Sequence, residues 1–242
     1  MINKKSFIQH PDFKEGEVLL INKDLDWTSF DVVNSLKIYL KYEFGIKKIK
    51  IGHAGTLDPR ATGLVIVCTG KQTKSIDTYQ AREKEYTGSF RLGHTTPSWD
   101  GETEPDQQFS TEHISGEMIR QATKQFTGTI LQTPPIFSAL KVDGKRAYKF
   151  ARSNQEVTMQ QRQVEVFDFE ITRIEMPLVF FRVRCSKGTY IRSLANDFGI
   201  ALGSGAYLSS LHRTAIGEFR VEDALTISEF KQLYRQNSSV QE

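Results

Sequence analysis

The chain has 242 residues, of which 38% are hydrophobic and 25% charged, so its composition is that of a globular protein with a substantial core. No run approaches the roughly 18 to 20 apolar residues of a membrane span, and residues 1–14 lack the apolar region of a signal peptide, which predicts a cytoplasmic protein that does not enter a membrane. The net charge of +3 is too small to identify a partner.

The two cysteines argue against a metal or disulfide framework. Cys68 and Cys185 each lie in an apolar, strand-like run, and they lack the paired spacing of a zinc site. We therefore expect two buried free thiols and no metal.

The first half of the chain alternates strands and helices. Hydrophobic spacing predicts strands at residues 18–21, 64–68 and 85–92. A helix is expected from about Ser29, and its apolar stripe comprises Phe30, Val33, Leu36 and Leu40. A second helix is expected at residues 115–126, ending at Gly128, with its core face formed by Met118, Ile119, Ala122 and Phe126.

The second half contains mainly strands. The pair Asp143-Gly144 predicts a hairpin whose basic residues project on an exposed arm. Strands are expected at residues 163–174 and 179–185, and the second alternates between an apolar face and a basic face with Arg182 and Arg184. Helices are expected at residues 189–198, ending at Gly199, and after the capping box that starts at Thr226. Because several strands follow one another, we predict an α+β fold with a mixed, mainly antiparallel sheet and peripheral helices.

One loop concentrates conformational constraints around a single acid. Residues 52–63 contain three glycines and Pro59, and they lead directly into the apolar run 64–68. Pro59 disfavours the helical region for Asp58, so its carboxylate is expected on a rigid turn before a buried strand. This is how a catalytic group is often presented, but the local pattern alone favours an ordinary turn in which Asp58 bonds its own backbone.

Basic residues cluster at two places that could form one positive face. The first cluster comprises Lys141, Lys145, Arg146, Lys149 and Arg152, and the second comprises Arg182, Arg184, Lys187 and Arg192. By contrast, residues 92–119 contain six acids and no Lys or Arg. Each cluster alone could be a solvated surface, but together they favour a nucleic acid as partner.

A second dense segment, residues 187–192, opens the predicted helix at 189–198. Tyr190 and Arg192 lie at its N-terminal end and could face a cleft. An arginine within reach of a carboxylate favours the ionised acid and fixes its orientation, so we predict that Arg192 pairs with Asp58.

Five ordered segments together resemble the bacterial tRNA pseudouridine-55 synthases, the TruB family of pseudouridine synthases. The resemblance covers nearly the whole chain, and it is carried by residues 52–63, 83–86, 134–152, 187–192 and 207–214. It implies the pseudouridine synthase fold and an enzyme that flips a uridine out of the tRNA T-loop and isomerises it without a cofactor.

The resemblance also implies roles for individual residues. Asp58 matches the essential catalytic aspartate, Tyr86 the tyrosine that stacks on the target base, and Arg192 the arginine that pairs with the aspartate. The carboxylate could attack the sugar, attack the base or remove a sugar proton. Further matches line the nucleotide site and bind the RNA: His53, Tyr190, Leu211, Lys145 and Lys149.

The remaining expectations concern organisation and partners. Residues 126–152 correspond to an insertion that contacts the tRNA, within a single catalytic domain spanning residues 1–242. The short remainder after Thr214 predicts that the C-terminal PUA domain is lacking, and with it the guide RNA of archaeal and eukaryotic relatives. We expect a monomer by default.

The alternative is a tRNA-folding chaperone without catalysis, which would need basic surface and stacking aromatics but no buried acid. The role of Asp100, and that of the altered turn at 23–29, stay open.

Overall fold

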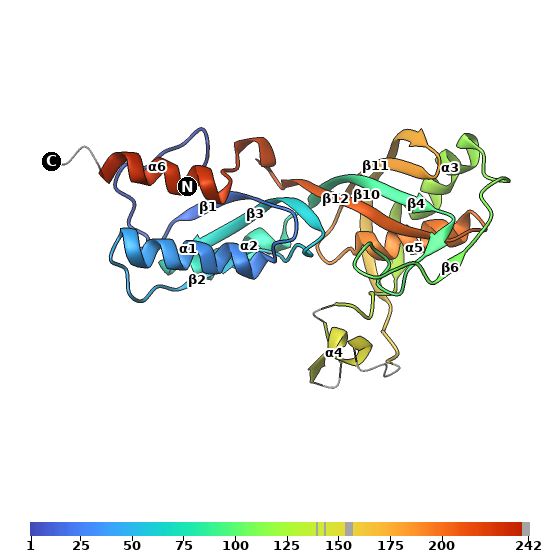
Figure 1. Ribbon diagram of the computed structural model, residues 1–242, viewed down its shortest axis with the longest axis horizontal. Coiled ribbons are helices and arrows are strands. Elements are labelled where there is room, and N and C mark those ends of the chain that lie inside the picture. The colour runs from blue at the N-terminus through green and yellow to red at the C-terminus, as the bar shows by residue number, and fades with distance from the viewer. Residues whose placement is uncertain (139, 143, 153–156, 239–242) are drawn as a thin grey trace. The chain divides into compact units, whose positions relative to one another are not determined.

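The computed structural model describes residues 1–138, 140–142, 144–152 and 157–238, and it contains two compact units (Figure 1). The first unit comprises Met1–Glu85 and His212–Glu242, and the second comprises Tyr86–Leu211. Two strands, β4 (Lys84–Leu92) and β12 (Ala206–Ile216), contribute residues to both units. The prediction of a single catalytic domain stays a prediction, and each unit is described by itself.

The sheet of the first unit has β3 at its centre. Strand β3 (Ala61–Thr69) lies between β1 (Val18–Lys23) and β12, and it also pairs with the short strand β2 (Ile51–His53). All six residues of β1 pair antiparallel with residues 63–68 of β3. Strand β2 pairs antiparallel with β3 near the C-terminal end of β3. The strand β13 (Phe219–Arg220) extends β12 as a hairpin. The strands predicted at 18–21 and 64–68 are therefore confirmed.

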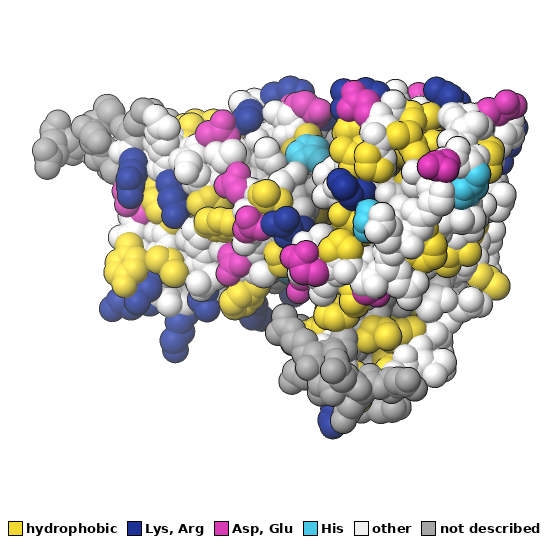
Figure 2. Space-filling model, turned by 45° about the vertical axis from the view of Figure 1, so that its right-hand side comes forward, with side chains coloured by type: hydrophobic (Ala, Val, Ile, Leu, Met, Phe, Trp, Pro, Cys, Tyr) yellow, Lys and Arg dark blue, Asp and Glu magenta, His cyan; other side chains and the backbone are white. Residues whose placement is uncertain are grey.

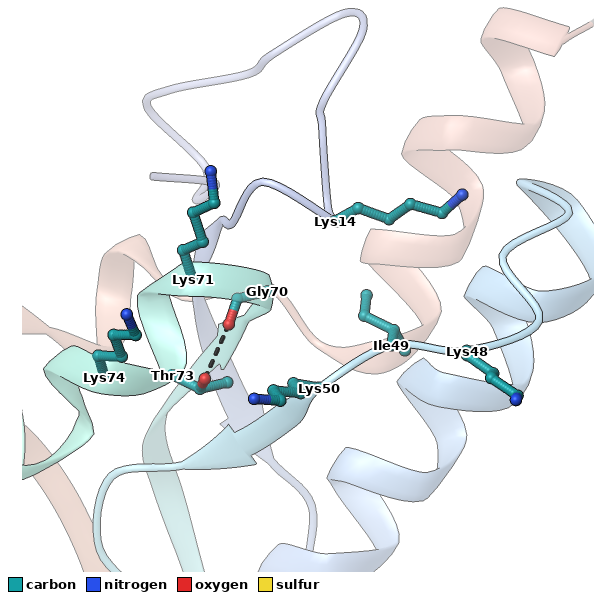
Figure 3. A pocket seen from close by; sticks show the side chains of 8 residues that line it. All are labelled: Lys14, Lys48, Ile49, Lys50, Gly70, Lys71, Thr73 and Lys74. Atoms are coloured by element: carbon teal, nitrogen blue, oxygen red, sulfur yellow. Dashed lines mark hydrogen bonds between the residues drawn. The ribbon is translucent and has the colours of Figure 1, made fainter.

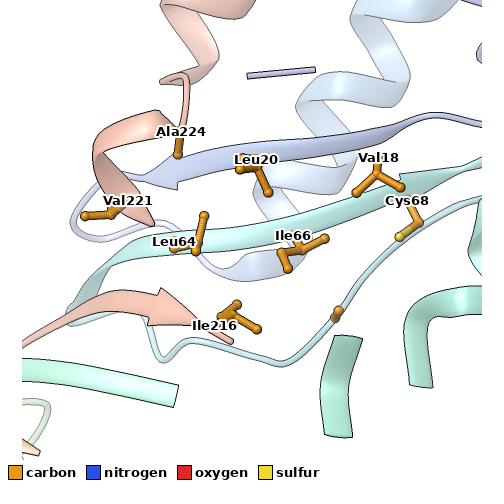
Figure 4. Close-up of a cluster of buried hydrophobic side chains, with 9 residues drawn as sticks. Val18, Leu20, Leu64, Ile66, Cys68, Ile216, Val221 and Ala224 are labelled. Atoms are coloured by element: carbon orange, nitrogen blue, oxygen red, sulfur yellow. The ribbon is translucent and has the colours of Figure 1, made fainter. Parts of the chain in front are cut away.

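Alternate residues of β3 build the core of the first unit. Leu64, Ile66 and Cys68 pack against Val18 and Leu20 of β1 (Figure 4). Val65 and Val67 are also fully buried, so both faces of β3 are covered, which explains its continuous apolar sequence. Both cysteines are buried free thiols, as predicted, and burial raises the pKa of Cys68 to about 11.

Two longer helices and three short ones, among them a 3₁₀ turn at Val221–Asp223, are described in the first unit. Helix α1 (Ser29–Glu43) begins with a capping box between Thr28 and Asp31. Helix α6 (Ile227–Ser238) begins with the predicted box of Thr226 and Glu229. Between β3 and β4 lie a 3₁₀ helix (Gly70–Ser75) and α2 (Ile76–Ala81). The two longer helices share a cluster of aromatic rings: Phe13, Tyr39, Phe44, Phe230 and Tyr234.

The predicted apolar stripe of α1 is wrong at one position. Phe30 is 69% exposed, whereas Val32 and Val33 are buried together with Leu36 and Leu40. The helix turns by about 100° per residue, so the face that starts at Ser29 continues through positions three and four residues later and leaves Phe30 outside.

The second unit contains the strand order β12-β4-β11-β10-β7. Its long hairpin joins β10 (Arg162–Glu175) to β11 (Leu178–Cys185), and β7 (Gly128–Gln132) pairs with β10. Four phenylalanine rings, Phe90, Phe169, Phe181 and Phe198, form its aromatic core. The strand pairs β1·β3, β2·β3, β7·β10 and β10·β11 are antiparallel, and isolated bridges add parallel pairing, so the predicted α+β fold with a mixed, mainly antiparallel sheet is confirmed.

Helices and short hairpins surround this sheet. Helix α3 (Gly116–Ala122) passes into a 3₁₀ turn (Thr123–Phe126), and α5 (Ile191–Ala201) follows β11. The predicted hairpin arm is present as β8 (Lys141–Val142) paired with β9 (Lys145–Arg146), followed by α4 (Ala147–Arg152). A further short pair joins β5 (His94–Thr95) to β6 (Gln107–Gln108).

Three local predictions in the second unit are wrong. Met118 is 41% exposed and not part of the core face of α3. Helix α5 continues through Gly199, where a Cβ would lie only 2.7 Å from the Cβ of Ala206, so glycine here permits close packing. The alternation of β11 is correct, but its second face is not simply basic, because Arg182 pairs with Asp168 and Glu170 of the neighbouring strand.

Gly63→Ala should destabilise the first unit. Gly63 has a φ of 107°, and a Cβ there would lie 2.7 Å from the backbone nitrogen of Arg213. Strain and overpacking together predict a loss of about 2 to 4 kcal/mol in the free energy of unfolding, measured by urea denaturation. Gly45→Ala is the matched control, since Gly45 also has a positive φ of 62° but nothing within 4 Å. Equal losses in the two variants would contradict the packing argument.

Candidate active site

The loop that carries Asp58 is anchored on both sides of the acid. It connects β2 to β3, and Ala54 and Leu57 within it are buried. The backbone N–H of Leu57 donates to Ser29 Oγ at 2.8 Å, and the N–H of Ala61 donates to the carbonyl of Asp58 at 3.0 Å. Asp58 itself is half-buried. The backbone around Asp58 is thus held by its own turn and by the first residue of α1.

A buried lysine lies beneath this loop. Lys23, at the end of β1, is 1% exposed, and its ammonium donates to the carbonyls of Asp24 at 2.9 Å and Trp27 at 2.6 Å. A longer hydrogen bond of 3.5 Å reaches the carbonyl of Pro59, the residue after Asp58. Burial lowers the pKa of Lys23 to about 8, although the negative charge of Asp58 acts in the opposite direction. A cation is therefore held at the base of the aspartate loop.

A buried arginine fixes the other side of the loop. Arg213 of β12 is 1% exposed, and its guanidinium donates to the carbonyl of Leu64 at 2.7 Å and to that of Gly55 at 3.2 Å. The adjacent His212 places Nδ1 2.7 Å from Thr62 Oγ1. Strand β12 thus hydrogen-bonds to the chain before Asp58, at Gly55, and after it, at Thr62 and Leu64.

His53 immediately precedes the anchored loop. Its imidazole is half-buried, and Nδ1 has no hydrogen-bond partner within the described residues. Burial lowers its pKa, so the ring is neutral at pH 7. A neutral imidazole next to the aspartate loop can contact a nucleotide without adding a charge.

In the second unit, Arg192 forms a buried ion pair with Asp100. Their side chains are 4% and 5% exposed, and Arg192 Nε lies 3.5 Å from Asp100 Oδ2. The guanidinium also donates to the carbonyl of Ser98 at 3.4 Å. The hydroxyl of Ser98 and the N–H of Glu102 donate to Asp100 Oδ1 at 2.7 and 2.9 Å. Asp100, whose role the sequence left open, therefore holds the arginine that heads α5.

Tyr190 is positioned by an amide side chain that the sequence did not indicate. Gln132, at the end of β7, is fully buried; its Oε1 accepts the N–H of Tyr190 at 2.7 Å, and its Nε2 donates to the carbonyl at 3.0 Å. The guanidinium of Arg162 lies 4.6 Å from the centre of the Tyr190 ring. These contacts fix the start of α5, where Arg192 follows.

The predicted site residues fall into both units. Asp58 and His53 belong to the first unit, whereas Tyr86, Tyr190, Arg192 and Leu211 belong to the second. Tyr86 is 8% exposed on β4, and Leu211 is half-buried on β12. The predicted pairing of Asp58 with Arg192 joins residues of different units and stays a prediction.

The two predicted RNA-binding lysines of the arm, Lys145 and Lys149, belong to β9 and α4. Lys145 is exposed, and its ammonium lies 6.0 Å from the centre of the Phe150 ring. The side chain of Lys149 lies outside the described residues, although its backbone is part of α4.

Two negative findings apply to the part of the chain that the structure describes. Within it, no group of three or more His, Cys, Asp or Glu side chains could hold a metal ion. No described helix is both long enough and apolar enough to cross a membrane.

The buried ammonium of Lys23 predicts a pH-dependent stability. Its pKa is about 8 in the folded protein, compared with 10.5 for an exposed lysine, so above pH 8 the unfolded chain binds more protons than the folded one. The free energy of unfolding of the unsubstituted protein, relative to Lys23→Met, should therefore rise between pH 8 and 10 by up to about 3 kcal/mol.

Urea denaturation at a series of pH values measures this difference. Lys41→Met is the control, because Lys41 lies at an exposed position of α1. The same pH dependence for both substitutions would show that the ammonium of Lys23 is not held in a desolvated site.

Two family models match consecutive segments of the chain. Residues 41–191 match the TruB family pseudouridylate synthase (N terminal domain), and residues 192–242 match the tRNA pseudouridylate synthase B C-terminal domain. The chain is 54% identical over 222 residues to tRNA pseudouridine synthase B of Flavobacterium johnsoniae, covering 91% of this chain and 97% of the relative. The relative from Parabacteroides distasonis is 50% identical over 226 residues, covering 93% and 96%.

Solved structures agree. A chain in the crystal structure of a Cbf5-Nop10-Gar1 complex is 29% identical with a TM-score of 0.68, and the match covers 93% of this chain and 60% of that one. A chain in the structure of an H/ACA RNP bound to a substrate RNA containing 2'-deoxyuridine is 28% identical with a TM-score of 0.67, covering 95% and 57%. The five sequence segments, the anchored aspartate loop and these matches lead to one conclusion. This chain belongs to the TruB family of pseudouridylate synthases.

Proposed function

We propose that the chain isomerises uridine to pseudouridine in tRNA, at position 55 of the T-loop, with Asp58 as the catalytic carboxylate. The observation that carries this proposal is the anchoring of Asp58, because its loop is fixed by Ser29, by the buried Lys23 and by the buried Arg213. The family membership and the relatives named tRNA pseudouridine synthase B support the reaction and the substrate.

The reaction is balanced without a co-reactant. The bond between C1′ of the ribose and N1 of uracil breaks, and a bond between C1′ and C5 forms after the base has turned. The proton on C5 leaves and N1 gains one, so no atom or electron is added. A carboxylate can begin this sequence by attacking the sugar, by attacking the base or by removing a sugar proton.

The other site residues hold the flipped nucleotide in this proposal. Tyr86 stacks on the base and assists removal of the C5 proton, while Arg192, fixed by Asp100, orients Asp58. His53, Tyr190 and Leu211 line the nucleotide. Flipping costs a few kcal/mol, and stacking on one aromatic ring returns about 1–3 kcal/mol. Phosphate contacts must therefore supply much of the net affinity.

The proposal also covers location, oligomeric state and the way the target is found. The chain acts in the cytoplasm on tRNA as a monomer and finds its target without a guide RNA. A non-catalytic chaperone would gain nothing from an acid anchored at three points, so the enzyme is favoured. Assistance to tRNA folding can accompany the reaction.

Asp58→Asn should abolish catalysis. The amide is nearly isosteric but cannot act as a nucleophile or base, so tritium release from tRNA labelled at C5 of uridine should fall about 10³-fold or more. Asp26→Asn is the matched control; this acid is 67% exposed and pairs with Arg60. Without tritium release from the unsubstituted protein, the enzyme assignment is wrong. Equal release from Asp58→Asn would reject only the residue.

Lys145→Ala combined with Lys149→Ala should weaken tRNA binding. If both ammonium groups contact phosphates, the slope of log affinity against log salt should become shallower by about 2. Filter binding at several salt concentrations measures the slope. The control replaces Lys4 and Lys5 by Ala, which pair with Glu229 and Asp223 in the first unit. An unchanged slope in the arm variant would remove the arm from the RNA-binding surface.

A further inference from the structure

Five lysines from three separate segments surround one pocket in the first unit. The pocket has a volume of ≈ 340 Å³ and is lined by Lys14, Lys48, Lys50, Lys71 and Lys74 (Figure 3). Lys14 precedes β1, Lys48 and Lys50 precede β2, and the other two belong to the 3₁₀ helix after β3. The fold brings these charges together, because the segments are far apart in sequence.

Most of this charge lacks an acidic partner. Lys71 pairs with Glu15 at 2.6 Å, and Asp12 is also close enough to act on Lys71 electrostatically. For Lys14, Lys48, Lys50 and Lys74, by contrast, no ion pair is recorded among the described residues. Four like charges around one hollow repel one another and are stabilised by an anionic ligand.

The hollow continues into a second, more apolar pocket of ≈ 400 Å³. The two pockets share Ile49, Lys50 and Thr73, and the second adds Lys37 and the exposed ring of Phe30. In Figure 2, Lys and Arg side chains gather beside hydrophobic ones at the lower left, where Figure 1 places α1 and β2. A groove of this length and charge suits a chain of phosphates better than a single small anion.

The lysine pocket lies at the opposite end of β3 from the catalytic loop. Asp58 is three residues before Ala61, the first residue of β3, whereas Gly70 follows its last residue, Thr69. Eight steps along a strand of about 3.3 Å each separate these ends by about 26 Å. The lysine pocket is therefore remote from Asp58, whereas His53, which pairs with Val67, lies between the two ends and closer to the pocket.

We propose that the lysine pocket is a second RNA-binding site, which holds the sugar-phosphate backbone of tRNA at the end of β3 remote from Asp58. This inference rests on the proposed function, since it takes the RNA to be bound with its uridine at Asp58. The pocket contributes affinity for tRNA segments outside the T-loop and leaves the chemistry at the uridine unchanged.

The test compares two RNAs and one variant. The variant replaces one lysine from each segment by glutamine: Lys14, Lys50 and Lys74. The RNAs are full-length unmodified tRNA and a T-loop hairpin whose stem is too short to extend about 26 Å from the target uridine. For full-length tRNA we expect Kd to rise about 10-fold or more and the salt slope to become shallower by about 2 to 3. For the short hairpin, Kd and the rate of pseudouridine formation should not change.

A matched control has the same change of charge elsewhere on the first unit, with Lys4, Lys5 and Lys231 replaced by glutamine. The proposal is overturned if tRNA binding by the pocket variant is unchanged, if the control weakens tRNA binding equally, or if the short hairpin loses as much affinity as tRNA. Turnover of the hairpin by the unsubstituted protein tests the proposed function separately, because that result does not depend on the pocket.

Discussion

The geometry of the catalytic loop depends on the hydrogen bonds that the buried ammonium of Lys23 donates to backbone carbonyls. The ammonium donates to carbonyls of the segment that leads into α1 and, over a longer distance, to Pro59 beside Asp58. A charge in the interior is costly unless its hydrogen bonds are satisfied, and here backbone carbonyls satisfy them. The same segment supplies Ser29, which binds Leu57, so the start of α1 and the aspartate loop constrain each other.

A comparable arrangement recurs in the second unit. Arg192 is buried against Asp100 and the carbonyl of Ser98, and the acid is itself held by a hydroxyl and a backbone N–H. Removing one partner from such a pair costs about 3 to 5 kcal/mol, because the other charge stays buried. The loop of Asp58 and the side chain of Arg192 are thus held by neighbours before RNA binds, and preorganisation of this kind lowers the cost of reaching the reactive geometry.

Local patterns in the sequence predicted the strands, the capping box of Thr226, the hairpin arm and the alternation of β11. These features depend on residues that are close in the chain. Two of the errors have non-local causes: Arg182 is neutralised by acids of another strand, and Gly199 stays in α5 because it packs against Ala206. The partner of Arg192 and the support of Tyr190 by Gln132 depend on tertiary contacts that no spacing rule encodes. Asp58 could be named as a candidate because a Gly- and Pro-rich loop before a buried strand has a local signature, whereas the five lysines have none.

The lysines of the first unit divide into two kinds by burial, and the division separates two tasks. Lys23 is desolvated and its hydrogen bonds are directed at the backbone, so RNA cannot reach it and its role is to hold the loop. Lys14, Lys48, Lys50 and Lys74 are exposed around a hollow and keep their hydration until a polyanion displaces it. Phosphate binding by exposed lysines falls steeply with salt, whereas a desolvated contact is hardly screened. Salt should therefore weaken tRNA binding while leaving the geometry around Asp58 intact. The affinity for tRNA and the geometry of the catalytic loop thus depend on different lysines.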